Sequence, residues 1–173
     1  VGSLLVNRLI DRGDKVTVLD SLLHKSPSLL QHFINPNFRF VEGDVRDAEK
    51  VKDALVGADA VVHLAAIVGA PGCEAEPQLA KEVNHEAVVL LISLAGPDRA
   101  LIYASTGSNY GEVEGICTED TPLNPLSTYG VTKTAGEIAM LESGSAVCYR
   151  FATAFGLSPR MRLDLLINDF TYQ

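Results

Sequence analysis

The sequence has 173 residues, of which 47% are hydrophobic, so it is long enough for one globular domain with a substantial core. Twenty-two acidic residues against fourteen basic ones give a net charge of -8, which opposes binding to a nucleic-acid backbone because such binding needs clustered cations. No apolar run approaches the length of a membrane span, so we expect a soluble protein with neither a nucleic-acid nor a membrane partner.

The first half of the chain alternates helical and strand patterns. In "SLLVNRLIDRGD" apolar residues recur at helical spacing until Gly13, which predicts a helix that ends there. The runs "KVTVLD" and "FRFVEGD" are typical of strands, and "DAEKVKDALVGAD" predicts a second helix with Asp47 as its N-cap and Gly57 at its end.

The second half repeats this alternation. We predict strands in "DAVVHLAA", "RALIYAST" and "AVCYRFATAFG", and longer helices over about residues 80–94 and 128–141. A loop rich in Gly, Glu and Pro covers residues 111–125. Strands that alternate with helices favour an α/β fold with a doubly wound parallel sheet.

The predicted fold lacks a strand before its first helix. In a doubly wound sheet that strand is central, and its loss would expose the edges of both neighbouring strands. We therefore expect the 173 residues to belong to a longer chain.

The predicted strand ends contain residues suited to a dinucleotide. Asp20 lies eighteen residues after Gly2 (20 minus 2), close to the separation between a dinucleotide-binding glycine turn and the acid that binds the ribose hydroxyls. A carboxylate there would repel a 2'-phosphate, which favours NAD over NADP. Asp44, at the end of the next strand, could reach the adenine amino group. For both aspartates the alternative is an ordinary turn-forming residue.

Tyr129 and Lys133 are separated by one helical turn in "STYGVTK", so their side chains leave one face of the predicted helix. A tyrosine with a pKa near 10 is a poor base at neutral pH, but a nearby ammonium favours its phenolate. The preceding strand end offers three hydroxyls, Ser105, Thr106 and Ser108, of which Thr106 is our choice to hold a substrate oxygen. The alternative is a surface tyrosine with a solvated lysine.

At these residues the sequence resembles the extended short-chain dehydrogenase/reductase family, the NAD-dependent sugar-nucleotide epimerases and dehydratases. The resemblance spans the whole chain and lies in "VGSLLVNRLIDRGDKVTVLD", "EGDVRD", "VVHLAA", "VNHEAVVLL", "YASTGSNYG", "TPLNPLSTYGVTKTAGE" and "RFATAFG". It implies catalysis by Thr106, Tyr129 and Lys133 and a substrate site that includes Thr106, Ser108 and Thr153. The cofactor positions that it implies are Gly2, Asp20, Asp44, Val45, Leu64, Ala65, Ala66, Asn84, Tyr129 and Lys133.

The activity implied by the resemblance is a 4-epimerase-like oxidation at C4 of a nucleotide-linked hexose with NAD as cofactor. Dehydratases of the family have an Asp-Glu pair where this chain has Gly107 and Ser108, which favours epimerisation. A 4,6-dehydratase, a keto-sugar reductase and a redox-silent dinucleotide-binding scaffold remain alternatives. Thr153 and Asn109 also depart from the family, which more often has asparagine at the first position and an apolar residue at the second.

The remaining expectations concern organisation and location. Residues 1–156 are expected to form the incomplete NAD-binding Rossmann domain, and residues 157–173 the start of a truncated substrate-binding region. The resemblance implies a homodimer through the helices at 83–94 and 128–141. Three widely spaced cysteines suit a reducing cytoplasm better than a disulfide framework, and the four histidines show no metal-ligand spacing. We predict no metal site.

Overall fold

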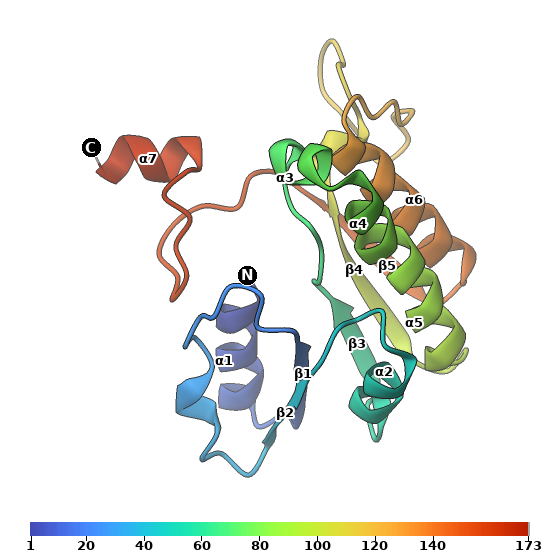
Figure 1. Ribbon diagram of the computed structural model, residues 1–173. Helices are drawn as coiled ribbons and strands as arrows, with labels where there is room; N and C mark the ends of the chain where they lie inside the picture. The colour runs from blue at the N-terminus through green and yellow to red at the C-terminus, as the bar shows by residue number, and fades with distance from the viewer. Residues whose placement is uncertain (173) are drawn as a thin grey trace. The chain divides into compact units, whose positions relative to one another are not determined.

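The computed structural model describes residues 1–172 (Figure 1). Their contacts group them into two compact units. Unit 1 comprises Val1–Asp44 and the segment from Thr153 onward, and unit 2 comprises Val45–Ala152.

Unit 1 contains a parallel strand pair and two α-helices. Its elements in chain order are α1 (Gly2–Arg12), β1 (Val16–Asp20), a 3-10 turn (Leu30–His32), β2 (Phe38–Glu42) and α7 (Leu166–Tyr172). The β1–β2 register runs from Val16 opposite Phe38 to Asp20 opposite Glu42. Gly13 ends α1 in the left-handed region at φ 95°, a conformation that glycine adopts without steric cost.

Unit 2 contains a three-stranded parallel sheet in the order β3-β4-β5. Its strands are β3 (Ala60–His63), β4 (Ala100–Thr106) and β5 (Ala146–Phe151). Its helical elements are α2 (Ala48–Leu55), α3 (Ala70–Ala75), α4 (Pro77–Lys81), a π-helical segment (Glu82–Glu86), α5 (Ala87–Ala95), a 3-10 turn (Gly107–Asn109) and α6 (Thr128–Glu142).

All five predicted strands are present and every strand pair is parallel, which confirms the predicted fold class. The fifth strand is shorter than "AVCYRFATAFG", because β5 ends at Phe151. Asp47 caps α2 as predicted, accepting hydrogen bonds from the backbone N–H groups of Glu49 and Lys50. The short helices α3 and α7 were not predicted, since neither carries a long apolar period.

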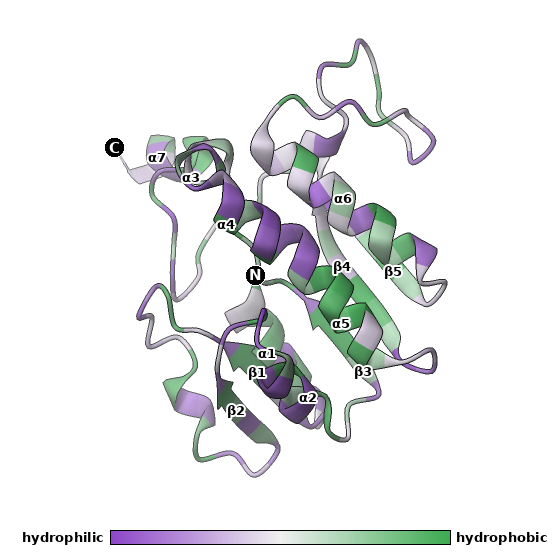
Figure 2. Ribbon diagram, turned by 45° about the vertical axis from the view of Figure 1, so that its right-hand side comes forward, coloured by the Kyte–Doolittle hydropathy of each residue, from purple (hydrophilic) through white to green (hydrophobic). Residues whose placement is uncertain are grey.

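The core of unit 2 lies between its sheet and the helices. Figure 2 shows α5 and much of the β3–β5 sheet in the colours of hydrophobic residues. Buried apolar residues come from α2, α5, β4 and α6, and they include Val51, Leu55, Val88, Leu91, Leu101, Tyr103 and Met140. Two charged side chains of α6, Lys133 and Glu137, are buried in the same region at 2% and 1% exposure.

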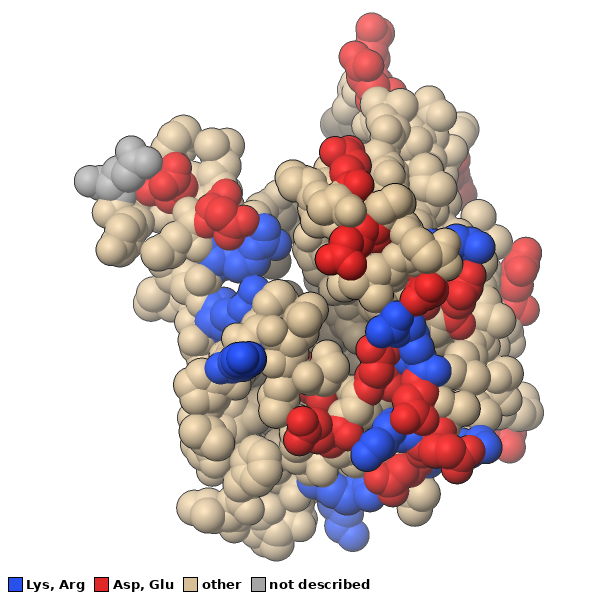
Figure 3. All heavy atoms as spheres, in the orientation of Figure 1, with Lys and Arg blue, Asp and Glu red and all other residues tan. Residues whose placement is uncertain are grey.

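Surface charges of both signs are interspersed on the face shown in Figure 3. Unit 2 contributes three exposed ion pairs, which are Arg46–Glu82, Lys52–Glu49 and Lys81–Glu86. Such pairs contribute little to stability, about 0–1 kcal/mol each.

Candidate active site

The first two turns of α6 present the tyrosine and lysine selected from the sequence. Ser127 is the N-cap, and its Oγ accepts a hydrogen bond of 3.1 Å from the backbone N–H of Gly130. This cap fixes where the helix begins, because it satisfies one of the N–H groups that the first turn leaves unpaired. Tyr129 is half-buried and Lys133 is buried one turn later, as the i, i+4 spacing predicted.

Lys133 is unusual because its charge is buried without an acidic partner. Its Nζ lies 3.9 Å from the centroid of the Tyr103 ring, a cation–π contact that partly replaces hydration. Within residues 1–172 the structure gives this ammonium no hydrogen-bond acceptor and no ion pair. Burial lowers the pKa of Lys133 to about 7, although Cys148, Glu137 and Cys73 act in the opposite direction.

Side chains from three neighbouring strands of the unit 2 sheet lie next to Lys133. His63, Tyr103 and Cys148 are register neighbours on β3, β4 and β5, so they project from one face. The His63 and Tyr103 rings stack with centroids 5.9 Å apart. Burial and the charge of Lys133 lower the pKa of His63 to about 3, so this histidine is neutral at physiological pH. Burial and the neighbouring Tyr129 raise the pKa of Tyr103.

Thr106 lies at the carboxyl end of β4, where the resemblance placed a catalytic hydroxyl. Its Oγ1 accepts a hydrogen bond of 3.1 Å from the backbone N–H of Ser108, and the residue is 7% exposed. A hydroxyl that already accepts one hydrogen bond keeps its own hydrogen for donation. Thr106 is therefore suited to donate to a substrate oxygen.

The turn after Thr106 packs against the beginning of α6. A Cβ added at Gly130 would lie 2.9 Å from Cβ of Pro125 and 3.0 Å from the backbone oxygen of Ser108, distances that side chains do not tolerate without movement. The absence of a side chain next to Tyr129 thus allows the Thr106–Ser108 turn to approach the helix. The structure brings Thr106, Ser108, Tyr129 and Lys133 to one region of unit 2.

Asn84 connects α6 to the segment that follows β3. It lies in the π-helical segment, a geometry that often accompanies functional sites, and its side chain is fully buried. Its Oδ1 accepts from the Ile67 N–H at 2.8 Å, and its Nδ2 donates to the Ile67 carbonyl at 3.0 Å and to Thr132 Oγ1 at 3.1 Å. These bonds make Asn84 a brace beside Lys133, and its contact with a cofactor stays a prediction.

The other predicted cofactor positions are divided between the two units. In unit 2, Leu64, Ala65 and Ala66 follow β3 directly and are half-buried, and Val45 lies in a turn before α2. In unit 1, Gly2 is the first residue of α1 and Asp20 the last of β1, where its Oδ1 accepts a hydrogen bond of 2.7 Å from the Leu22 N–H. The turn-forming role considered for Asp20 is thus present. Asp44 and Thr153 also fall in unit 1, and the roles of all these residues stay predictions.

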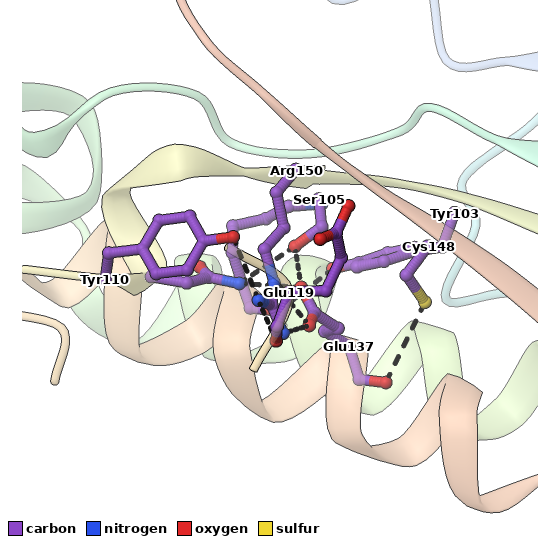
Figure 4. Close-up of polar contacts among 9 residues, drawn as sticks. Tyr103, Ser105, Tyr110, Glu119, Glu137, Cys148 and Arg150 are labelled. Atoms are coloured by element: carbon purple, nitrogen blue, oxygen red, sulfur yellow. Dashed lines mark hydrogen bonds and ion pairs between the residues drawn. The ribbon is translucent and has the colours of Figure 1, made fainter. Parts of the chain in front are cut away.

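Sequence reasoning missed a buried charge network around Glu137 (Figure 4). Glu137 pairs with Arg150 of β5 at 2.7 Å. Its carboxylate also accepts hydrogen bonds from Ser105 Oγ and, at 2.8 Å, from Asn109 Nδ2. The available signal was a lone glutamate one turn after Lys133 on the same helix face, within a stretch of small and apolar residues. Asn109, at a position where the resembled family more often has an apolar residue, uses its polar side chain to donate to this carboxylate.

Within the part of the chain that the structure describes, no group of three or more His, Cys, Asp or Glu side chains could hold a metal ion. A search of the same residues for a helix long and apolar enough to cross a membrane also found none. The cysteines Cys73, Cys117 and Cys148 are free thiols.

Comparison with known proteins gives a consistent result. The model of the NAD dependent epimerase/dehydratase family matches residues 1–171. The low-salt glycan biosynthesis protein Agl12 of Haloferax volcanii is 35% identical over 98% of this chain and 58% of its own length. The UDP-glucose 4-epimerase of Corynebacterium glutamicum is 30% identical over 91% of this chain and 45% of its own length.

Solved structures agree with these relatives. UDP-glucuronic acid 4-epimerase from Bacillus cereus in complex with NAD is 28% identical, with a TM-score of 0.83 over 97% of this chain and 57% of that protein. DesIV, a dTDP-glucose 4,6-dehydratase from Streptomyces venezuelae with NAD bound, gives 28% identity and a TM-score of 0.86 over 99% of this chain. The chain spans about half the length of the relatives and structures that it matches.

Proposed function

Because this chain belongs to the NAD dependent epimerase/dehydratase family, we propose that it is part of an NAD-dependent oxidoreductase of the sugar-nucleotide 4-epimerase type. The observation that carries the proposal is the buried ammonium of Lys133, which has only an aromatic face as its partner within residues 1–172 and lies one helical turn from Tyr129. A fold retained only as a scaffold gains nothing from such a costly charge.

The residues present fit a dinucleotide and a sugar. The Lys133 ammonium has donors available for the hydroxyls of a nicotinamide ribose, and the small Ala65 and Ala66 leave room for a flat ring after β3. In unit 1, Gly2, Asp20 and Asp44 would hold the pyrophosphate, the adenosine ribose and the adenine. NAD, when bound, supplies a hydride acceptor for C4 of the hexose and later returns the hydride.

The protein's own residues would handle the proton and the developing charge. Tyr129, as phenolate, removes the proton of the C4 hydroxyl as a general base. The Lys133 ammonium favours that phenolate through charge, since opposite charges one turn apart stabilise each other in a water-poor site. Thr106 donates a hydrogen bond to the C4 oxygen, and Ser108 and Thr153 would contact the sugar.

Epimerisation is preferred over dehydration because the turn after Thr106 is Gly107–Ser108. Neither residue can protonate a leaving C6 hydroxyl, which a 4,6-dehydratase requires. The test is to incubate full-length protein and NAD with UDP- and dTDP-hexoses and to analyse the products by NMR. A C4 epimer is expected, and a 4-keto-6-deoxy sugar would overturn the preference.

Tyr129→Phe separates an enzyme from a redox-silent scaffold. Turnover should fall by about 10²- to 10⁴-fold, the usual contribution of a general base, while NAD still binds, as measured by fluorescence titration. Tyr149→Phe is the matched control, because Tyr149 is 52% exposed on β5. Undiminished turnover in Tyr129→Phe would remove the proposed role of the phenol.

Association and location are part of the same proposal. Apolar side chains exposed on α5 and α6 include Val89, Val131, Ile138 and Leu141, each 46–52% exposed, and they support a homodimer through these helices.

Residues 1–156 would act as the cofactor domain, with a substrate-binding region starting at 157. The three free thiols support a cytoplasmic location.

A further inference from the structure

We propose that Glu137 is a positioning residue, whose buried carboxylate holds Thr106 in place by accepting hydrogen bonds from a side chain on each side of it in the sequence. The inference rests on the proposed function only in what Thr106 is positioned for. Ser105 directly precedes Thr106, and Asn109 closes the 3-10 turn that follows it. Both side chains donate to the same oxygen, Oε2 of Glu137.

This arrangement turns a five-residue segment into a closed loop. Asn109 Nδ2 also donates to Ser105 Oγ at 2.9 Å, so the two ends of the segment are bonded to each other as well as to the carboxylate. Thr106 lies inside this loop, and its Oγ1 accepts the Ser108 N–H. The orientation of the Thr106 hydroxyl is therefore set by a turn whose ends are both attached to α6.

Arg150 extends the attachment to the loop before α6. Its Nε and Nη2 donate to Oε1 of Glu137 at 2.9 and 2.7 Å. Its Nη1 donates to the Tyr110 hydroxyl and to the Glu119 carbonyl, both at 3.0 Å, and the guanidinium lies 5.0 Å from the Tyr110 ring centroid. Figure 4 shows Arg150 with its hydrogen bonds to Glu137, Tyr110 and Glu119.

A purely stabilising role explains this network poorly. Buried ion pairs can often be replaced by apolar side chains without loss of stability, and their best supported benefit is a defined geometry. Here the defined geometry is that of the strand end carrying the proposed catalytic hydroxyl. A displacement of about 1 Å at such a group is sufficient to slow a reaction by about 100-fold.

The test is Glu137→Gln in the full-length protein, with Glu142→Gln as a matched control at the exposed end of the same helix. The amide keeps the size of the side chain but presents N–H donors to Ser105, Asn109 and Arg150, which are themselves donors to Glu137. We expect kcat to fall about 10- to 100-fold, with KM and NAD affinity within about 3-fold of wild type. Glu142→Gln should match wild type.

A double-mutant cycle with Thr106→Val distinguishes positioning from general destabilisation. If Glu137 acts through the Thr106 hydroxyl, Glu137→Gln should have little further effect on kcat in the Thr106→Val protein. Equal losses in both backgrounds would overturn the inference. If Thr106→Val itself leaves turnover unchanged, the proposed role of Thr106 fails instead.

Hydrogen exchange supplies a readout that does not depend on activity. Amides of residues 105–110 should exchange faster in Glu137→Gln than in wild type or Glu142→Gln, while those of α5 stay unchanged. Unchanged exchange of residues 105–110 would refute the inference even if no substrate were found. Should Glu137→Gln fail to fold, Asn109→Ala tests the same loop because it removes one attachment and leaves the Glu137–Arg150 pair in place.

Discussion

Lys133 and Glu137 are two buried charged residues one turn apart on α6, and they differ in how many hydrogen-bond and ion-pair partners they have. Glu137 is 1% exposed and has four hydrogen bonds, two of them from the cation Arg150. Lys133 is 2% exposed and has the Tyr103 ring as its partner within residues 1–172. A charge that is fully paired is part of the framework, whereas one buried without an acceptor retains hydrogen-bonding capacity for a ligand.

The contrast also explains the pKa values. Hydrogen bonds that Arg150 donates to the Glu137 carboxylate and to the Tyr110 hydroxyl hold the pKa of Arg150 above its ordinary value, because they favour the charged guanidinium. Burial lowers the pKa of Lys133 to about 7, since no neighbouring carboxylate fully offsets the loss of water. The Arg150 guanidinium is therefore charged near neutral pH, whereas the protonation of Lys133 changes in that range.

Removal of the cation from the paired site should have the largest effect on stability. Arg150→Met leaves the Glu137 carboxylate buried without its counter-charge, and we expect the free energy of unfolding to fall by about 3–5 kcal/mol. Urea denaturation at pH 7 measures the loss. Arg12→Met, which removes an exposed pair with Asp14, should cost less than about 1 kcal/mol.

The double variant Glu137→Leu/Arg150→Met tests whether removing both charges restores the stability that is lost when Arg150 alone is replaced. Once both charges are gone, no uncompensated charge is left, although Ser105 and Asn109 lose their acceptor, so part of the lost stability should return. A double variant as unstable as Arg150→Met alone would show that packing, and not the charge, dominates the site.

Removal of the Lys133 charge should raise the free energy of unfolding, in contrast to removal of the Arg150 charge. Lys133 is protonated up to about pH 10.5 in the unfolded chain but only to about pH 7 in the folded one, so the unfolded state binds more protons between these values. The contribution of Lys133 to the free energy of unfolding of the wild-type protein therefore becomes more favourable as the pH rises from 7 toward 10.5. Lys133→Met should stabilise the NAD-free protein by about 1–3 kcal/mol at pH 7, with a smaller gain at pH 9.5.

Thermal unfolding at the two pH values measures this gain, and Lys52→Met serves as an exposed control. Lys133→Met should also lose turnover, because the ammonium that favours the Tyr129 phenolate is absent. A less stable Lys133→Met protein would show that the ammonium is held by favourable interactions and would weaken its assignment to a ligand.

The smallest expected effect concerns His63, which lies beneath Lys133. Its pKa is lowered from 6.5 to about 3 by burial and by Lys133, so stability should fall as pH drops below 6.5 and the unfolded chain takes up a proton. The slope approaches about 1.4 kcal/mol per pH unit. His63→Phe, which preserves a stacked ring, should flatten the loss between pH 6.5 and 5, whereas the exposed His24→Phe should retain the wild-type slope.

Local sequence patterns determined the elements of this protein. The five strands and the longer helices followed from apolar periodicity, and the cap at Asp47 followed from a side chain that accepts hydrogen bonds from nearby backbone N–H groups. The i, i+4 spacing of Tyr129 and Lys133 was sufficient to place them on one helix face, because helix geometry depends on neighbours in the chain.

Only the tertiary structure decided how the buried charges are partnered. Ser105, Asn109 and Arg150 lie 32, 28 and 13 residues from Glu137 in the sequence, and their meeting depends on the parallel pairing of β4 with β5 and on the packing of α6 against both. The contact between the Tyr103 ring and Lys133 likewise depends on the packing of α6 against the sheet. Sequence periodicity reports which face of an element is buried, but the partners of a buried charge are set by elements distant in the chain.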